Sequence, residues 1–377
     1  GAEAIPVEIS IIRDEVKLED SAASGKVKEI TSPDGQKLKI GYIDLPSFYF
    51  DFEGAMKGKK DFRSSSRDVK NLLKSFKKDN IDGLVLDLRS NGGGSLRESI
   101  ALTGLFIKAG PVVQTRDFKG RVRVEDDRDP SCDYDGPLLV LVNRLSASAS
   151  EIFAGAIQDY GRGIIVGEKS THGKGTVQTI INLKNILRRF GVENPGSVKY
   201  TNAKFYRVSG GSTQHRGVIP DVCFDSFTDH MEIGEAKLEN ALPWDKIDAT
   251  AYQIDTSLKS FLPELKERSN KRRTESKPFQ QLTKTIELFK EKQERKSSSL
   301  NEEKRWKEYL ADKKIADEQR SLFKDLADAD GDDKDKEDDD KDIFLNEAVS
   351  ILSDYITLKE AKQQANVDPG EKDVKKR

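Results

Sequence analysis

The chain of 377 residues has few of the side chains that commonly hold metals or disulfides. Its two cysteines, Cys132 and Cys223, lie far apart and form no metal-like pair, and the sequence leaves a disulfide between them open. The three histidines, His172, His215 and His230, have no spacing typical of a metal site. We therefore expect no metal and no cofactor.

Long apolar runs and a strong net charge are also missing. No segment approaches the roughly 20 apolar residues that a membrane-spanning helix needs, so we expect no integral membrane segment. Lysine and arginine number 64 and aspartate and glutamate 66, which gives a net charge of −2. Because nucleic-acid binding usually leaves an excess of basic residues, this balance argues against it as the main task.

Strand and helix patterns alternate through the first part of the chain. Continuous apolar runs between turn residues predict buried strands, and apolar residues at helical spacing predict helices. We expect strands at residues 7–13, 39–45, 83–88, 138–142, 163–167 and 176–181, a linker at 21–25, and helices at 61–78, 96–109 and 151–160. This alternation is typical of an α/β layered core.

The composition changes after about Phe227. Residues 257–377 are rich in Lys, Glu and Asp, and apolar residues between Phe279 and Phe289 recur at helical spacing. We predict a helical domain containing an acidic loop near residues 328–342 that is disordered or solvated. The loop partly imitates a calcium-binding pattern, but Leu326 occupies the first ligand position and cannot bind a cation.

Ser148 is the first candidate for chemistry. Ser148 and Glu151 have the spacing of a helix capping box, and helix capping alone explains a serine at this position. A serine at a helix start also lies beside free backbone N–H groups, so the Ala149 N–H could stabilise an oxyanion. Ser146 and Ser150 are rivals, and the sequence does not choose among the three.

Lys174 is the second candidate. It lies between two glycines, and a solvated turn lysine is the plain interpretation. In a dry pocket, however, a lysine amine loses its proton more readily and can act as a general base. If the following strand begins near Lys174, Gln178 lies on the same face and could aim the amine without holding it protonated. Otherwise, Gln178 is an ordinary polar strand residue.

A glycine-rich turn at residues 87–94 is the third feature. Gly93 and Gly94 end a run of three glycines between a strand and a helix, where backbone N–H groups could complete an oxyanion hole. The ending expected of a phosphate-binding loop is absent. A plain tight turn explains the glycines equally well.

Together, these segments resemble the tail-specific, or C-terminal processing, serine proteases. The matching motifs, in order, lie at residues 87–94, 148–151, 167–178 and 217–221, and the region from Leu242 onward resembles the long bacterial branch. The resemblance implies a layered crotonase-like or ClpP-like β–α core at residues 25–240. It also implies a mostly helical domain at 241–377, and the end of a truncated PDZ domain with a linker at 1–24.

The resemblance also implies roles for the candidate residues. Ser148 falls on the nucleophile, Lys174 on the base and Gln178 on the residue that orients it. Ala149 and either Gly93 or Gly94 fall on the oxyanion hole, and Asp159 is a weaker candidate for support. The implied activity is a serine endopeptidase that needs no cofactor.

The implied substrates are proteins or peptides with apolar C-termini, and the implied location is the periplasm or another exported compartment. An adaptor protein or a homo-oligomer is a further partner that the family allows. Two other functions remain open: a catalytically inactive protein-binding fragment, and a crotonase-like acyl-CoA enzyme, which rests on fold analogy alone.

Overall fold

The computed structural model describes residues 22–191, 194–294, 297, 299–327 and 342–367. Within them, a six-stranded sheet has the order β1–β2–β3–β6–β7–β10 and a four-stranded sheet the order β5–β4–β9–β8. The larger sheet comprises Ser24–Thr31, Lys37–Asp44, Gly83–Asp87, Leu138–Val142, Ile164–Gly167 and Val222–Cys223, in that spatial order. The smaller sheet comprises Val122–Asp127, Gly110–Asp117, Ser197–Tyr206 and Thr176–Asn182.

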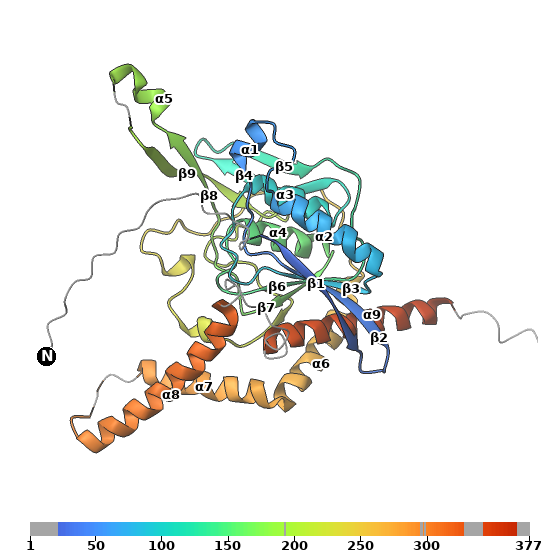
Figure 1. Cartoon of the computed structure of the whole chain (residues 1–377), viewed down its shortest axis with the longest axis vertical. Coiled ribbons are helices and arrows are strands. Elements are labelled where there is room, and N and C mark those ends of the chain that lie inside the picture. The colour runs from blue at the N-terminus through green and yellow to red at the C-terminus, as the bar shows by residue number, and fades with distance from the viewer. Residues whose placement is uncertain (1–21, 192–193, 295–296, 298, 328–341, 368–377) are drawn as a thin grey trace, which may run out of the picture.

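Helices flank the larger sheet on both sides (Figure 1). The helices are α1 (Phe52–Met56), α2 (Ser65–Asp79), α3 (Leu96–Gly104), α4 (Ala149–Tyr160), α5 (Lys184–Leu187), α6 (Leu262–Glu275), α7 (Lys277–Glu294), α8 (Glu302–Ala327) and α9 (Ile343–Val367). Helices α2, α3 and α4 pack on one face of the sheet, and α6 and α9 pack on the other.

The central strands β3 and β6 explain why their sequences are apolar without interruption. Leu84 and Leu86 of β3 face the core beneath α2 and α4, whereas Val85 faces the core beneath α6 and α9. All three side chains are fully buried. A parallel strand covered on both faces has no solvent side that would favour polar residues, and β3 pairs in parallel with β2 and β6.

The C-terminal helices share this core. Leu265 of α6 and Ile351 and Leu352 of α9 belong to the same buried cluster as Val85 and Leu139 of the sheet. Burial of such side chains is the main favourable contribution to folding. Helices α6 and α9 are therefore packed on the sheet through one continuous apolar layer.

Strands β8 and β9 continue beyond the smaller sheet as a two-stranded arm. Figure 1 shows this arm standing away from the body of the molecule, with α5 near its end. Ile180, Phe190 and Val198 on this part of the chain are exposed. The arm starts two residues after Lys174, because β8 begins at Thr176.

The expected α/β core with a mostly helical C-terminal region is confirmed, but some element bounds differ. The helix predicted at residues 96–109 ends at Gly104, because the Leu105 carbonyl accepts the N–H groups of Asp133 and Tyr134 instead of continuing the helix. The predicted linker at 21–25 includes the start of β1, whose residues pair with β2. Strands β4, β5 and β9 were not predicted.

Two predicted segments lie outside the described residues. These are the strand at 7–13, assigned to a PDZ remnant, and nearly all of the acidic loop near 328–342. The exception is Asp342, which is not solvated but nearly buried, and whose side chain accepts the N–H groups of Phe344 and Leu345 at the start of α9.

The described residues also bear on membrane spanning and on the cysteines. No helix among them combines enough length with enough apolarity to cross a bilayer. Cys132 and Cys223 are both free thiols, which answers the open question of a bond between them.

Candidate active site

Ser148 precedes the first residue of α4 and has an unusual backbone conformation, with φ 58° and ψ −111°. Non-glycine residues rarely occupy positive φ, and such strain concentrates at functional sites. The rival serines are fully buried and already bonded. The Ser146 hydroxyl donates to the Leu88 carbonyl at 2.7 Å, and the Ser150 hydroxyl donates to the Asn91 carbonyl at 2.8 Å. Ser148 alone of the three is partly exposed.

Glu151 connects the Ser148 turn to the loop that carries Lys174. Its Oε2 accepts the backbone N–H groups of Ser148 at 2.8 Å and Lys174 at 3.0 Å. Its Oε1 accepts the Thr171 hydroxyl at 2.6 Å and the Gly173 N–H at 2.7 Å. Burial raises the pKa of Glu151 to about 7, although these four hydrogen bonds favour the carboxylate. One buried side chain thus fixes two segments that are distant in sequence.

Lys174 lies in an environment that favours its neutral form. The side chain is partly buried, and burial lowers the pKa of its amine, with the nearby Lys199 ammonium lowering it further. Glu235 and Glu151 act weakly in the opposite direction. The loop backbone is held by the Thr213 hydroxyl, which donates to the Lys174 carbonyl at 3.0 Å. The amine can therefore serve as a base at a lower pH than an exposed lysine could.

The glycine turn packs directly against Ser148. Gly93 has φ 100°, and a Cβ atom built on it would lie 2.7 Å from the Ser148 Cβ and 2.9 Å from the Ala149 nitrogen. The Gly93 N–H donates to the Asn91 Oδ1 at 2.9 Å. No hydrogen bond engages the N–H of Gly94 or of Ala149 within the described residues. The structure thus brings Gly93 to the Ser148 turn beside the Ala149 nitrogen, whereas Gly94 packs against the Phe48 backbone.

Gln178 does not accompany Lys174 in the expected way. The strand begins at Thr176, after Lys174, and Gln178 is exposed on β8 where it pairs with Thr201. Among the described contacts, no hydrogen bond joins Gln178 to Lys174. The expectation depended on a strand that began at the lysine, and the start at Thr176 removes that premise.

A buried amide near the lysine comes instead from Gln214. Its Oε1 accepts the Gly175 N–H at 2.8 Å, and its Nε2 donates to Glu235 Oε1 at 3.0 Å. Gln214 was not predicted, because it lies 39 residues from Gly175 in a segment without a recognisable motif. Neither residue spacing nor hydrophobic pattern could have identified it.

His172 and Asp159 have other surroundings. His172 is half-buried, and burial lowers the pKa of its imidazole. Its backbone N–H donates to the Ser146 carbonyl at 2.9 Å, which places it on the edge of the same turn. Asp159 forms an ion pair with Arg207 at 2.7 Å, on the face of α4 that meets the turn after β9. Within the described residues, no group of His, Cys, Asp and Glu side chains could hold a metal ion.

Comparisons with known proteins match two successive regions of the chain. Residues 39–224 match peptidase family S41, and residues 228–357 match the C-terminal domain of tail-specific proteases. The chain is 38% identical over 364 residues to a tail-specific protease of Haemophilus influenzae, which covers 92% of this chain and 48% of that protein. It is 37% identical over 218 residues to a carboxy-terminal-processing protease of Bartonella bacilliformis, covering 58% of this chain and 43% of that protein.

Among solved structures, the photosystem II D1 C-terminal processing protease is similar over 56% of this chain and 50% of that chain, at 29% identity and a TM-score of 0.44. The chain spans about half the length of the curated relatives that it matches. The two matched regions together extend across both the sheet core and the C-terminal helices. The chain therefore belongs to peptidase family S41 and carries the C-terminal domain of the tail-specific proteases.

Proposed function

We propose that this chain is a serine endopeptidase in which Ser148 is the nucleophile and Lys174 the general base. The observation that carries the proposal is the bridge through Glu151, whose carboxylate accepts the N–H groups of both residues. A serine hydroxyl needs a neighbouring base to become a useful nucleophile. The lowered pKa of the Lys174 amine increases the fraction of this base that is neutral at a given pH.

The reaction proceeds in two steps, acylation and then deacylation of Ser148. Neutral Lys174 takes the hydroxyl proton as the Ser148 Oγ bonds to the scissile carbonyl carbon, and the carbonyl oxygen becomes an oxyanion. When this intermediate collapses, the C–N bond breaks and the leaving amine takes the proton from Lys174. Water then attacks the acyl-enzyme in the same way, releasing the carboxylic acid and restoring Ser148.

Ala149 and Gly94 supply the N–H groups that stabilise the oxyanion in this proposal, because both are free of hydrogen bonds within the described residues. Preorganised donors of this kind act without reorganising during the reaction. For the Gly93 N–H to contribute, the Asn91 side chain must first release it. The prediction that Gln178 orients Lys174 rests on the family alone, because Gln178 is exposed on β8. Gln214 holds the loop backbone at Gly175.

Substrate choice and location extend the same proposal. On the strength of the family, we assign proteins with apolar C-terminal tails as substrates and an exported or periplasmic location. An adaptor protein or a second copy of the chain is a further proposed partner, also on the strength of the family. The chain spans about half the length of its curated relatives. The preference for apolar C-terminal tails therefore has to be measured on this chain itself.

A serine-directed fluorophosphonate tests the proposal and separates it from an inactive binding fragment. The wild-type chain is expected to gain one phosphonyl group, which peptide mapping by mass spectrometry places on Ser148. Only an activated serine reacts. Labelling of Ser146 or Ser150 instead, or no labelling while a peptide with an apolar C-terminus still binds, would contradict the assignment and favour one of the alternatives.

Gly93→Ala is expected to lower kcat/KM for such a peptide at least ~10-fold, because the added methyl group pushes against Ser148 and Ala149 in a backbone conformation that disfavours L side chains. Gly92→Ala is the matched control, since a Cβ there meets nothing within 4 Å. Peptide hydrolysis rates check both variants. Equal activities of the two would show that close packing against Ser148 is unimportant.

A further inference from the structure

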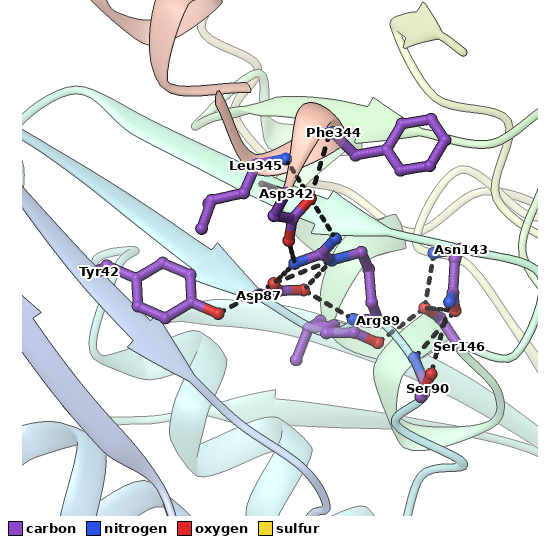
Figure 2. Close-up of polar contacts among 10 residues, drawn as sticks. Tyr42, Asp87, Arg89, Ser90, Asn143, Ser146, Asp342, Phe344 and Leu345 are labelled. Atoms are coloured by element: carbon purple, nitrogen blue, oxygen red, sulfur yellow. Dashed lines mark hydrogen bonds and ion pairs between the residues drawn. The ribbon is translucent and has the colours of Figure 1, made fainter. Parts of the chain in front are cut away.

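Arg89 lies between the strand β3 and the glycine turn, and its guanidinium is held between two carboxylates (Figure 2). Its Nη2 lies 2.6 Å from Asp87 Oδ2 and 2.7 Å from Asp342 Oδ2. Its Nη1 donates to Asp342 Oδ1 at 3.1 Å, and the Tyr42 hydroxyl donates to Asp87 Oδ2 at 3.1 Å. The three charged side chains are between 4% and 16% exposed. This is a buried, geometrically specific cluster.

Asp342 brings the C-terminal region into this cluster. Its Oδ1 accepts the N–H groups of Phe344 at 3.1 Å and Leu345 at 2.9 Å, so the same carboxylate also begins α9. Burial raises the pKa of Asp342, but Arg89 and these two N–H groups outweigh burial and keep the pKa below its ordinary value. The carboxylate is therefore charged and holds Arg89 by two hydrogen bonds.

The backbone around Arg89 is bonded to the nucleophile turn. The Leu88 carbonyl accepts the Ser146 hydroxyl at 2.7 Å, and the Ser90 N–H donates to Asn143 Oδ1 at 2.9 Å. The Asn91 carbonyl accepts the Ala147 N–H at 2.9 Å. A shift of Arg89 therefore displaces the backbone that supports Ser148 and the glycine turn.

Docking of α9 does not itself need this ion pair. The helix already buries Ala348, Ile351 and Leu352 against the sheet, and a separate pair joins Glu347 to Arg272 of α6 at 2.8 Å. Buried ion pairs add little net stability, and their best-attested use is to fix a specific arrangement. The Asp342 carboxylate is thus better suited to setting the position of Arg89 than to holding the helix.

We infer that Asp342 is a positioning residue for the reaction, acting through Arg89 on the turn at residues 90–94. Catalytic geometry in the sheet core then depends on the docked start of α9. This inference rests on the proposed function and names the C-terminal region as a part that completes the site. No contact between Asp342 and substrate is required.

Asp342→Asn in the full chain is the first test. Asparagine caps helices about as well as aspartate, so α9 keeps its start while the charge facing Arg89 is lost. We expect kcat to fall about 10-fold with KM within twofold, and phosphonate labelling of Ser148 to slow by the same factor. Asp342→Glu is expected to recover part of the rate, because it restores the charge.

Asp354→Asn is the matched control. Asp354 is also buried on α9 and pairs with Arg272 at 2.5 Å and with Arg268 at 3.4 Å, on the side of the helix that faces α6. Its kcat is expected to stay within twofold of wild type. If both variants lose activity equally, or if Asp342→Asn keeps the wild-type kcat and labelling rate, the inference is wrong.

Amide hydrogen exchange gives a readout that does not need activity. Exchange of the peptide covering residues 88–95 is expected to be several-fold faster in Asp342→Asn than in wild type, and unchanged in Asp354→Asn. If the wild-type chain neither cleaves the peptide nor is labelled, while the two variants still differ in exchange in this way, the proposed function is refuted and the coupling is supported. Unchanged exchange at 88–95 in an active enzyme would refute the coupling alone.

Discussion

Lys174→Ala is expected to lower kcat/KM for a peptide with an apolar C-terminus by ~10³-fold and to abolish phosphonate labelling of Ser148, because general-base catalysis contributes roughly 10²–10⁴-fold. Lys174→Arg is expected to be equally inactive. The arginine side chain is also long and basic, but its guanidinium does not give up its proton in proteins. Steady-state hydrolysis and labelling rates measure both effects.

A second lysine on the same loop provides the control. Lys169 is about half exposed and lies 3.5 Å from Asp225, so Lys169→Ala is expected to keep kcat/KM within twofold of wild type. The wild-type rate should also rise with pH and level off below the ordinary pKa of lysine, because only the neutral amine accepts a proton and burial lowers its pKa. Appreciable turnover by either Lys174 variant excludes the lysine as the base.

Glu151→Gln is expected to lower kcat/KM about 100-fold and to destabilise the fold by about 3 kcal/mol. An amide has one oxygen, whereas each carboxylate oxygen of Glu151 accepts two donors. Whichever way the amide turns, its NH₂ group faces two N–H or O–H donors, and each buried donor left unbonded costs roughly 1–3 kcal/mol. Urea unfolding and peptide hydrolysis report the two effects.

The pH dependence separates this role of Glu151 from simple packing. The proton of a neutral Glu151 would point at groups that are themselves hydrogen-bond donors. Protonation below about pH 7 therefore weakens the contacts through which Glu151 joins the Ser148 turn to the Lys174 loop. On a plot of log kcat/KM against pH, the wild-type slope is expected to approach two below about pH 7 and one above it. In Glu151→Gln only the slope of one from Lys174 should remain.

Glu98→Gln is the control for burying an amide. Glu98 is also buried, but its Oε2 holds the start of α2 through donors that include the Ser64 hydroxyl at 2.7 Å and the Ser66 N–H at 2.8 Å. Because a single oxygen accepts these donors, an amide can replace it, and kcat/KM is expected to stay within threefold. An identical pH slope in Glu151→Gln and wild type would remove Glu151 from the mechanism.

The core strands could be predicted from the sequence, whereas in the second sheet only β8 could be. Strands β3 and β6 are covered on both faces, so their residues form uninterrupted apolar runs. Strand β5 is largely exposed and contains Arg123, Glu125 and Asp126, so no apolar pattern marks it. Strand β1 is similarly exposed, and its position is set by pairing with β2 rather than by its own residues.

The candidate site shows the same division. Ser148, Glu151 and the glycine turn were found because local motifs specify helix caps and tight turns. The bond from Glu151 to Gly173 spans 22 residues, and the pair of Arg89 with Asp342 spans 253. Contacts over such separations are set by tertiary packing, which a single sequence does not display. For the same reason Asp342 was assigned to a solvated loop.

The wide separation of Arg89 and Asp342 has a consequence for the newly made protein. Ribosomes add roughly 5–20 residues per second, so over 253 residues the guanidinium is synthesised on the order of ten seconds or more before its second carboxylate. During that interval the face of the six-stranded sheet that α9 covers in the finished protein is not yet covered by that helix. Under the proposed coupling, the order of synthesis acts as a built-in delay, and a nascent protease reaches its full activity only after its last helices have been made.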